Sequence, residues 1–129
     1  MEIVTELPLS AAQGASELPQ IVQWLREKQV IDLDLMYGAG CNAETDRLWT
    51  AMPVELGALE DFIRRSVQDG IFAFANSDLY ISSRGKHSDD NDVVSFKLCL
   101  EADIHLVTDD RALLEKVKAH WLTRRWTVY

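Results

Sequence analysis

Apolar residues recur every three or four positions in three stretches of the chain, which is the spacing of one face of an α-helix. These stretches are residues 16–28, 53–70 and 111–121. The stripe positions are Leu18, Ile21, Val22 and Leu25; Leu56, Leu59, Ile63 and Val67; and Leu113, Leu114, Val117 and Trp121. The pattern therefore predicts three amphipathic helices.

The residues at the ends of these stretches suit helix boundaries. Ser16 can serve as the N-cap of the first helix. Pro53 suits the first turn of the second helix, and Gly70 suits its C-terminal stop. Between the two, residues 43–52 are expected to form a further short helix.

A different period marks the strands. Residues 30–36 alternate strictly, with Ile31, Leu33 and Leu35 on one side and acidic residues on the other. This alternation predicts a half-buried strand with a wetted acidic face. Residues 104–107 form a second short apolar run and a second predicted strand.

Apolar runs and the polar residues at their boundaries predict the secondary structure of two further segments. Residues 71–85 place two apolar segments around the polar residues 76–78, which predicts a β-hairpin. Residues 93–102 are apolar nearly all round, and their propensity also fits a strand. We favour a buried helix there, because Asp92 can cap it and the strand 104–107 follows directly.

The chain ends complete the expected fold. Residues 3–9 fit either a short edge strand or an ordered arm, and residues 124–129 fit a last strand. Helices between strands favour parallel pairing with right-handed crossovers. We therefore expect one small α/β (or α+β) domain over residues 1–129. Its mixed sheet would contain an antiparallel hairpin followed by a βαβ unit, with about four helices around it.

The charge balance restricts the kind of partner. The formal net charge is −8, which argues against nucleic-acid binding and is compatible with a basic protein partner. No apolar run has the length of a membrane span, and the first residues do not resemble a secretory signal. Cys41 and Cys99 lack zinc-finger spacing, so we expect two reduced thiols in a cytoplasmic protein.

The stretch LVTDD, residues 106–110, has a structural explanation. Thr108 or Asp109 can cap the helix that follows, and Asp110 then lies in its first turn. Asp109 is the better cap of the two carboxylates. A carboxylate in the first turn also interacts favourably with the positive end of the helix dipole.

The same residues allow a metal-dependent explanation. Asp109 and Asp110 follow an apolar strand, where ligands bind in parallel sheets. Asp32 or Asp34 would come close if their strand were a parallel neighbour, and Asp92 begins the preceding segment. Converging carboxylates of this kind bind Mg²⁺ or Mn²⁺, which can activate water for phosphodiester hydrolysis.

Residues 92–114, DVVSFKLCLEADIHLVTDDRALL, resemble the C-terminal signature of PIN-domain ribonucleases. The resemblance implies a divalent-metal ribonuclease with Asp32, Glu55, Asp92 and Asp110 as its catalytic acids. Asp92 and Asp110 would then be the metal ligands, and the metal would be Mg²⁺ or Mn²⁺. The chain also departs from the family: about 29 residues precede the first matching strand, and Glu101-Ala102 replaces the usual glycine turn. The gap from Asp32 to Glu55 is short, and the predicted hairpin at 71–83 has no counterpart in the family.

Two other polar clusters each have a structural explanation and a functional one, and both explanations stay open. The loop 86–92 offers His87, Asp89 and Asp90 as metal ligands, or is a solvated loop. A second group lies near the end of the last predicted helix and could be a basic patch or a solvated helix end. It consists of Lys118, His120, Arg124 and Arg125.

Aromatic residues on the predicted hairpin could build the core or an exposed partner-binding face. They are Phe72, Phe74 and Tyr80. Taken together, the sequence favours a small acidic, non-enzymatic protein-binding or regulatory domain of the inhibitor or immunity type, with no cofactor. The alternative is the PIN-like, metal-dependent ribonuclease.

Overall fold

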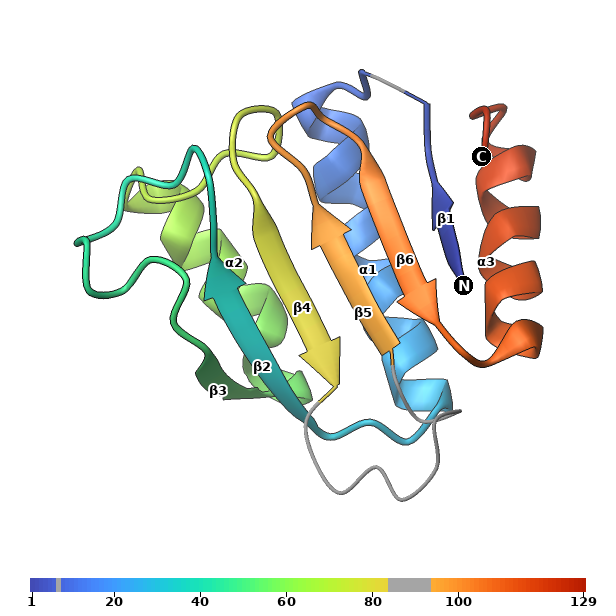
Figure 1. Ribbon diagram of the computed structural model, residues 1–129, viewed down its shortest axis with the longest axis horizontal. Helices are drawn as coiled ribbons and strands as arrows, with labels where there is room; N and C mark the ends of the chain where they lie inside the picture. The colour runs from blue at the N-terminus through green and yellow to red at the C-terminus, as the bar shows by residue number, and fades with distance from the viewer. Residues whose placement is uncertain (7, 84–93) are drawn as a thin grey trace.

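Six strands form one sheet in the computed structural model, which describes residues 1–6, 8–83 and 94–129. The strands are β1 (Glu2–Val4), β2 (Asp32–Tyr37), β3 (Met52–Glu55), β4 (Leu79–Ser83), β5 (Val94–Leu98) and β6 (Ile104–Thr108). The helices are α1 (Ala11–Glu27), the 3-10 turn η1 (Leu56–Ala58), α2 (Leu59–Gln68) and α3 (Arg111–Thr123). Across the sheet the order is β1-β6-β5-β4-β2-β3, and each neighbouring pair is antiparallel (Figure 1).

One small domain that combines helices with a sheet is confirmed, but the expected parallel βαβ unit is wrong. The helix expected over 93–102 is strand β5, in which Val94, Phe96 and Leu98 are buried while Ser95 and Lys97 are half-buried. Only five residues connect β5 to β6, which is too short for a parallel crossover. The described residues accordingly contain three α-helices rather than about four.

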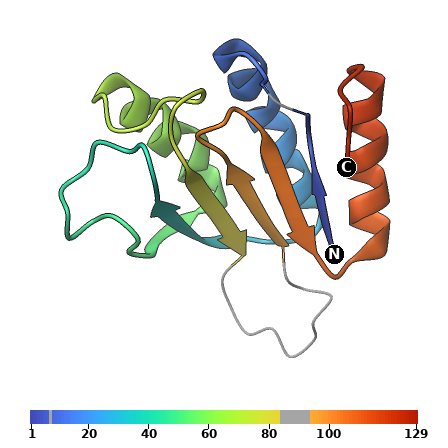
Figure 2. The same cartoon turned by 45° about the horizontal axis from the view of Figure 1, so that its top comes forward.

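The helices cover one face of the sheet. In Figures 1 and 2, α1 and α2 lie behind the strands, and α3 lies beside β1 next to α1. Trp24 of α1 stacks on Phe96 of β5, with ring centroids 6.0 Å apart and planes 7° apart. Trp121 of α3 is fully buried as well. Each fully buried apolar side chain contributes about 1.5–3 kcal/mol, so this layer provides most of the stability.

The predicted stripes of the three helices fill this core, with few exceptions. Leu18, Leu59 and Val117 are all buried at stripe positions. Val67 is 41% exposed, and Ile31, expected inside with its strand, is 67% exposed because β2 begins one residue later. The periodicity therefore predicted the buried faces of the elements, but it did not predict the burial of residues at their ends.

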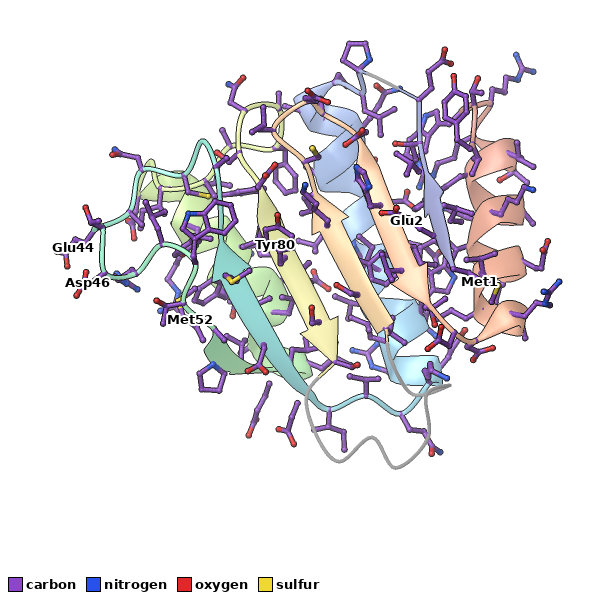
Figure 3. The ribbon with its side chains drawn as sticks, in the orientation of Figure 1. Met1, Glu2, Glu44, Asp46, Met52 and Tyr80 are labelled. Carbon is purple, nitrogen blue, oxygen red and sulfur yellow. The ribbon has the colours of Figure 1, made fainter. Side chains whose placement is uncertain are left out.

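The opposite face of the sheet, here called the open face, is covered by no helix in the described part of the chain (Figure 3). Its side chains are half-buried or exposed. They are Glu2, Val4, Asp32, Asp34, Met36, Pro53, Glu55, Tyr80, Ser82, Ser95, Lys97, His105 and Val107. Figure 3 shows Glu2 at the β1 end of this face and Tyr80 near its middle.

The first two helices begin at other residues than expected. Helix α1 begins after Ser10, whose hydroxyl accepts from the Gln13 backbone N–H (3.1 Å) while Gln13 Oε1 accepts from the Ser10 N–H (2.7 Å). This capping box satisfies two donors at once, which Ser16 cannot do inside the helix. Pro53 lies in the edge strand β3, where a missing N–H is tolerated. Gly70 does end α2, with a φ of +72°.

Three further expectations about local structure are wrong. Residues 43–52 form turns and the start of β3 rather than a helix. Residues 71–78 contain no strand, so the expected hairpin reduces to β4 alone. Near the C-terminus, 124–129 contributes an isolated bridge between Thr5 and Val128 instead of a strand. At the other end β1 confirms the edge-strand alternative for the N-terminal segment.

Among the described residues, no helix has both the length and the apolar character that crossing a membrane requires.

Candidate functional site on the open face of the sheet

Three of the four acids implied by the ribonuclease resemblance lie in the described part of the chain, and they occupy two places. Asp32 and Glu55 are direct partners in the β2–β3 register and are both exposed. They line a surface cavity of about 310 Å³ together with Leu33, Pro53 and Val54. The structure thus brings these two predicted acids together at the edge of the sheet.

Asp110 is the N-cap of α3 rather than a residue of its first turn. Its Oδ1 accepts from the Leu113 backbone N–H (3.2 Å), and its Oδ2 forms an ion pair with Lys28 (2.8 Å). The hydrogen bond from Lys28 is the main reason that the pKa of Asp110 is lowered. Asp109, expected to be the cap, instead lies 3.8 Å from the N-terminal amine. The Asp110 carboxylate is therefore already paired.

The remaining predicted ligands lie outside the described residues. These are Asp92 and the loop residues His87, Asp89 and Asp90. The helix that Asp92 was expected to cap is strand β5, so its role as a helix cap is wrong. Within 1–6, 8–83 and 94–129, Asp32, Glu55 and Asp110 belong to no group of three potential metal ligands.

A different set of polar side chains meets at the turn between β5 and β6. Cys99, Asp103 and His105 place their ligand atoms within 4.8 Å of one another. The turn is closed by two hydrogen bonds, from the Cys99 N–H to the Asp103 carbonyl (3.0 Å) and from the Ala102 N–H to the Cys99 carbonyl (2.8 Å). Ala102 has a φ of +62°, the left-handed position that short hairpin loops require. This geometry puts Cys99 directly across from Asp103.

His105 lies between two carboxylates. Its Nε2 is 3.1 Å from Asp103 Oδ1, and its Nδ1 is 3.0 Å from Glu2 Oε2. Carboxylates only accept hydrogen bonds, so both contacts are satisfied together when both ring nitrogens carry protons. We call Glu2, Cys99, Asp103 and His105 the hairpin cluster.

Cys99 is a poor nucleophile in this setting. Burial raises the pKa of its thiol to about 11, and the neighbouring carboxylates of Asp103 and Asp78 act in the same direction. The thiolate is the reactive form of cysteine, and little of it exists at neutral pH without a further positive charge. The hairpin cluster therefore does not support nucleophilic catalysis of the Cys–His type.

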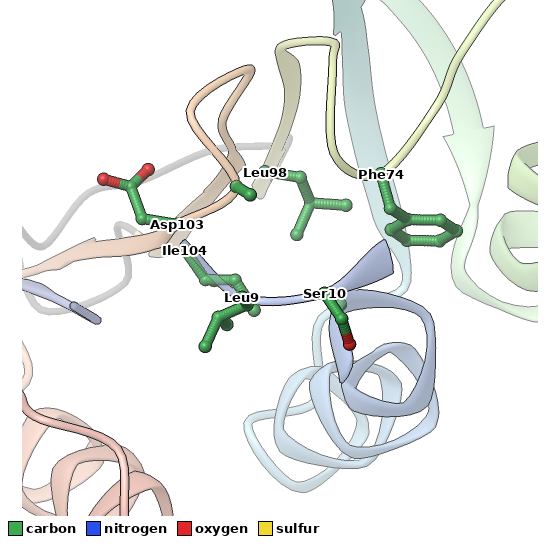
Figure 4. Close-up of a pocket in the computed structure, with 8 residues that line it drawn as sticks. Leu9, Ser10, Phe74, Leu98, Asp103 and Ile104 are labelled. Carbon is green, nitrogen blue, oxygen red and sulfur yellow. The ribbon is translucent and has the colours of Figure 1, made fainter. Parts of the chain in front are cut away.

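The pocket beneath the turn is too small for an organic ligand. Its volume is about 10 Å³, roughly the space of one water molecule. Figure 4 shows that the Asp103 carboxylate points away from the apolar side chains of Leu9, Leu98 and Ile104. The polar end of Asp103 is thus available to the hairpin cluster and not to this pocket.

Charged residues continue from the hairpin cluster toward the centre of the open face. Asp78 is 5% exposed, accepts from the Leu100 N–H (2.6 Å) and lies 3.7 Å from Lys97 Nζ. Burial, the largest single influence, acts to lower the pKa of Lys97. The charge of Asp78 and smaller contributions from Cys99 and Tyr80 together outweigh it, so the pKa of Lys97 is raised. The same ammonium lies 5.3 Å from the ring centroid of Tyr80.

An exposed tryptophan follows on the other side of Tyr80. Trp49 is 56% exposed, and its ring centroid is 6.1 Å from that of Tyr80. Its φ is +59°, a conformation that costs a bulky residue about 1–3 kcal/mol. The Trp49 N–H donates to the Tyr37 carbonyl (2.8 Å), which fixes the loop. A Cβ at Gly38 would lie 2.9 Å from Asp78 Cβ and 3.1 Å from the indole, so glycine is required there.

The basic group at the end of α3 is not a free patch. Glu17 of α1 is fully buried, accepts from Trp121 Nε1 (3.1 Å) and lies 3.2 Å from His120 Nε2. Arg124 Nε lies 3.0 Å from Glu17 Oε2, although its N–H is directed at His120 Nε2 (3.1 Å). Arg124, one of the four residues of this group, thus lies at ion-pair distance from a buried carboxylate.

Sequence reasoning missed the hairpin cluster for a specific reason. Cys99, Asp103 and His105 follow the pattern C-x-x-x-D-x-H, which resembles no zinc-finger spacing. The pattern becomes a signal only when 99–103 is a turn between paired strands, because residues 99, 103 and 105 then share one face. The expected helix over 93–102 concealed it. Likewise, Phe72 is buried in a loop, so of the three predicted hairpin aromatics only Tyr80 lies on the open face.

Comparison with known proteins gives no relative: no family model, no curated protein and no solved structure matches the chain.

Proposed function

We propose that this chain is a small protein-binding domain that docks a basic protein on the β2–β3 side of its open face. The observation that carries the proposal is Trp49. It is a large aromatic side chain exposed to solvent on a strained backbone, beside Tyr80. Strain of this kind persists where function requires it, and tryptophan and tyrosine are enriched among residues that dominate binding energy.

Charge complementarity supports a basic partner. Residues 29–63, here called the acidic segment, contain seven carboxylates and one cation, Arg47, a formal −6 of the net −8. The carboxylates are Asp32, Asp34, Glu44, Asp46, Glu55, Glu60 and Asp61. Glu44 and Asp46 are exposed in the same loop as Trp49, at the far edge of the sheet (Figure 3). An aromatic anchor inside an acidic rim favours a cationic surface, because opposite fields accelerate association.

The experiment is a comparison of baits at low and moderate salt. The reduced chain is immobilised, and proteins retained from its native cell are quantified by mass spectrometry for wild type and Trp49→Ala. We expect a basic protein that Trp49→Ala retains at least about tenfold less well, since a buried aromatic anchor contributes 2 kcal/mol or more. Retention should also fall steeply as salt rises.

Two charge variants provide the matched control. Glu44→Lys with Asp46→Lys changes the Trp49 loop. Glu115→Lys with Asp69→Lys makes the same change in net charge at two exposed positions, one in α3 and one at the C-cap of α2. The first pair should abolish retention and the second should preserve it. If both double variants lost retention equally, overall charge would explain the effect and the position of the acids would not. A partner retained equally well by wild type and Trp49→Ala would overturn the proposal.

The second candidate function is the metal-dependent ribonuclease. The observation that favours it is that Asp32 and Glu55 line one surface cavity. Titration with Mg²⁺ or Mn²⁺ should then shift the NMR signals of Asp32, Glu55, Asp92 and Asp110 together. No shift at millimolar metal would eliminate this candidate.

A further inference from the structure

The hairpin cluster contains three different donors that suit one metal ion. Cys99 supplies a sulfur, Asp103 a carboxylate oxygen and His105 a ring nitrogen, all within 4.8 Å of one another. We propose that these three residues bind Zn²⁺. Sulfur and imidazole donors select zinc over Mg²⁺ or Ca²⁺, which prefer oxygen alone. This site is separate from the docking surface proposed above and does not depend on it.

The donor spacing is close to what zinc requires. Bond lengths of about 2.0–2.1 Å to nitrogen and oxygen put two tetrahedral ligands about 3.3 Å apart. His105 Nε2 and Asp103 Oδ1 are 3.1 Å apart. An ion can therefore replace the hydrogen bond between them with small movements of side chains.

The backbone holds two of the ligands in place. Cys99 and Asp103 face each other across the closed turn, with the Cys99 N–H bonded to the Asp103 carbonyl. Both residues are 7% exposed, so little side-chain freedom is lost when they bind. Three protein ligands leave the fourth tetrahedral position to water.

Glu2 provides an independent indication of a metal site. Its carboxylate lies 3.0 Å from His105 Nδ1, the nitrogen that would not bind the ion. Zinc-binding histidines almost always donate their second N–H to a carboxylate or carbonyl, which orients the ring and strengthens the ligand. The β1–β6 pairing, with Val4 opposite His105, brings Glu2 to this position from the other end of the chain.

Lys97 places a positive charge beside the site, which opposes the binding of a cation. It is the register partner of His105, and its ammonium interacts with Cys99. Asp78, 3.7 Å from Lys97 Nζ, compensates this charge. Lys97→Met should therefore raise zinc affinity several-fold, because it removes a like charge beside the ion.

The test uses the full, reduced chain without an added affinity tag. Zn²⁺ is titrated by calorimetry, and Co²⁺ is added as a spectroscopic substitute that reports thiolate ligation by a charge-transfer band. We expect one ion per chain. Glu2→Gln should weaken zinc binding about 10–100-fold, and His105→Gln should weaken it by more than about 100-fold. Zinc should raise the Tm of the wild type but not of His105→Gln.

The matched control is the second thiol of the chain. Cys99→Ser should abolish the cobalt charge-transfer band, whereas Cys41→Ser, whose thiol donates to the Asp78 carbonyl, should leave it unchanged. If Cys99→Ser does not fold, His105→Gln provides the test instead, because His105 is only half-buried. Far-UV circular dichroism establishes that His105→Gln is folded. The proposal is overturned by absent zinc uptake, by uptake that His105→Gln leaves intact, or by a cobalt band that depends on Cys41.

Discussion

Charged side chains serve different purposes at the α1–α3 contact and in the acidic segment, residues 29–63. At the α1–α3 contact, each carboxylate meets a cation: Glu17 meets Arg124, Glu27 meets Lys116 and Asp110 meets Lys28. In the acidic segment, Glu44 and Asp46 are exposed in a loop that contains Arg47 as its single cation.

The difference separates stability from recognition. A buried carboxylate costs several kcal/mol unless a cation and hydrogen bonds compensate it, so the α1–α3 contact is sensitive to the loss of the partners of Glu17. Exposed carboxylates are solvated and cost little, so the acidic segment can concentrate charge without loss of stability. The exposed charges of Glu44 and Asp46 remain available to a partner.

The largest effect is expected for Glu17→Ala. It leaves the buried Trp121 N–H without an acceptor and removes the partner of Arg124. We expect a loss of about 3 kcal/mol in the free energy of unfolding, measured by urea denaturation. Glu27→Gln, also in α1, breaks an exposed ion pair with Lys116 of α3. It should change the midpoint of urea unfolding far less. Similar losses in both variants would contradict the distinction between buried and exposed pairs.

Gly38→Ala should have the next largest effect. The added Cβ would lie 2.9 Å from Asp78 Cβ and 3.0 Å from the Tyr80 ring, so the Trp49 loop must shift. Overpacking of this kind costs about 1–3 kcal/mol. Tryptophan fluorescence and urea unfolding measure the shift and the cost. Gly57→Ala, with open space around its Cβ, is the control and should be nearly neutral.

Asp110→Ala should cost about 1 kcal/mol, the usual value of a helix N-cap. Because Lys28 lowers the folded pKa of Asp110 below its ordinary 3.8, this contribution is complete above that pH. It is lost as the pH falls through the lowered pKa. The difference in the free energy of unfolding between wild type and Asp110→Ala should thus be constant from pH 7 to about pH 5. It should shrink in more acidic solution. A difference that grows on acidification would contradict the pairing with Lys28.

The smallest effect on stability is expected for Glu44→Gln combined with Asp46→Asn. The midpoint of urea unfolding should not change measurably, because both side chains are exposed. Association with a basic partner should nevertheless slow several-fold at low salt, and this difference should vanish at high salt. Stopped-flow or surface-based kinetics would measure it. A destabilised double variant would show that these acids have a structural role.

Local sequence signals were sufficient wherever one period was unambiguous. The 3.6-residue stripe of α1 and the alternation of β2 oriented Leu18, Ile21, Leu33 and Leu35 correctly toward the core. Gly70 marked the end of α2 because a left-handed residue there is otherwise costly. These features depend on residues that are close together in the sequence, so the sequence alone is enough to predict them.

The site residues depended on longer-range information. Asp32 and Glu55 do meet, through antiparallel pairing of β2 with β3. Asp110 was recognised as a helix-terminal acid, but its ion pair with Lys28, 82 positions away, was not. The run 93–102 fits a strand or a buried helix equally by hydrophobicity, and pairing with β4 and β6 decides for the strand.

By itself, the sequence determined the acidic character of the chain, the amphipathic helices and the half-buried strand, because composition and short periods define these features. Only the tertiary structure decided which face of the sheet stays open and which side chains meet on it. Glu2 and His105 are 103 positions apart, and Trp49 reaches Tyr80 across a strand. Such neighbours are set by strand order and register, which arise when the whole core is buried at once.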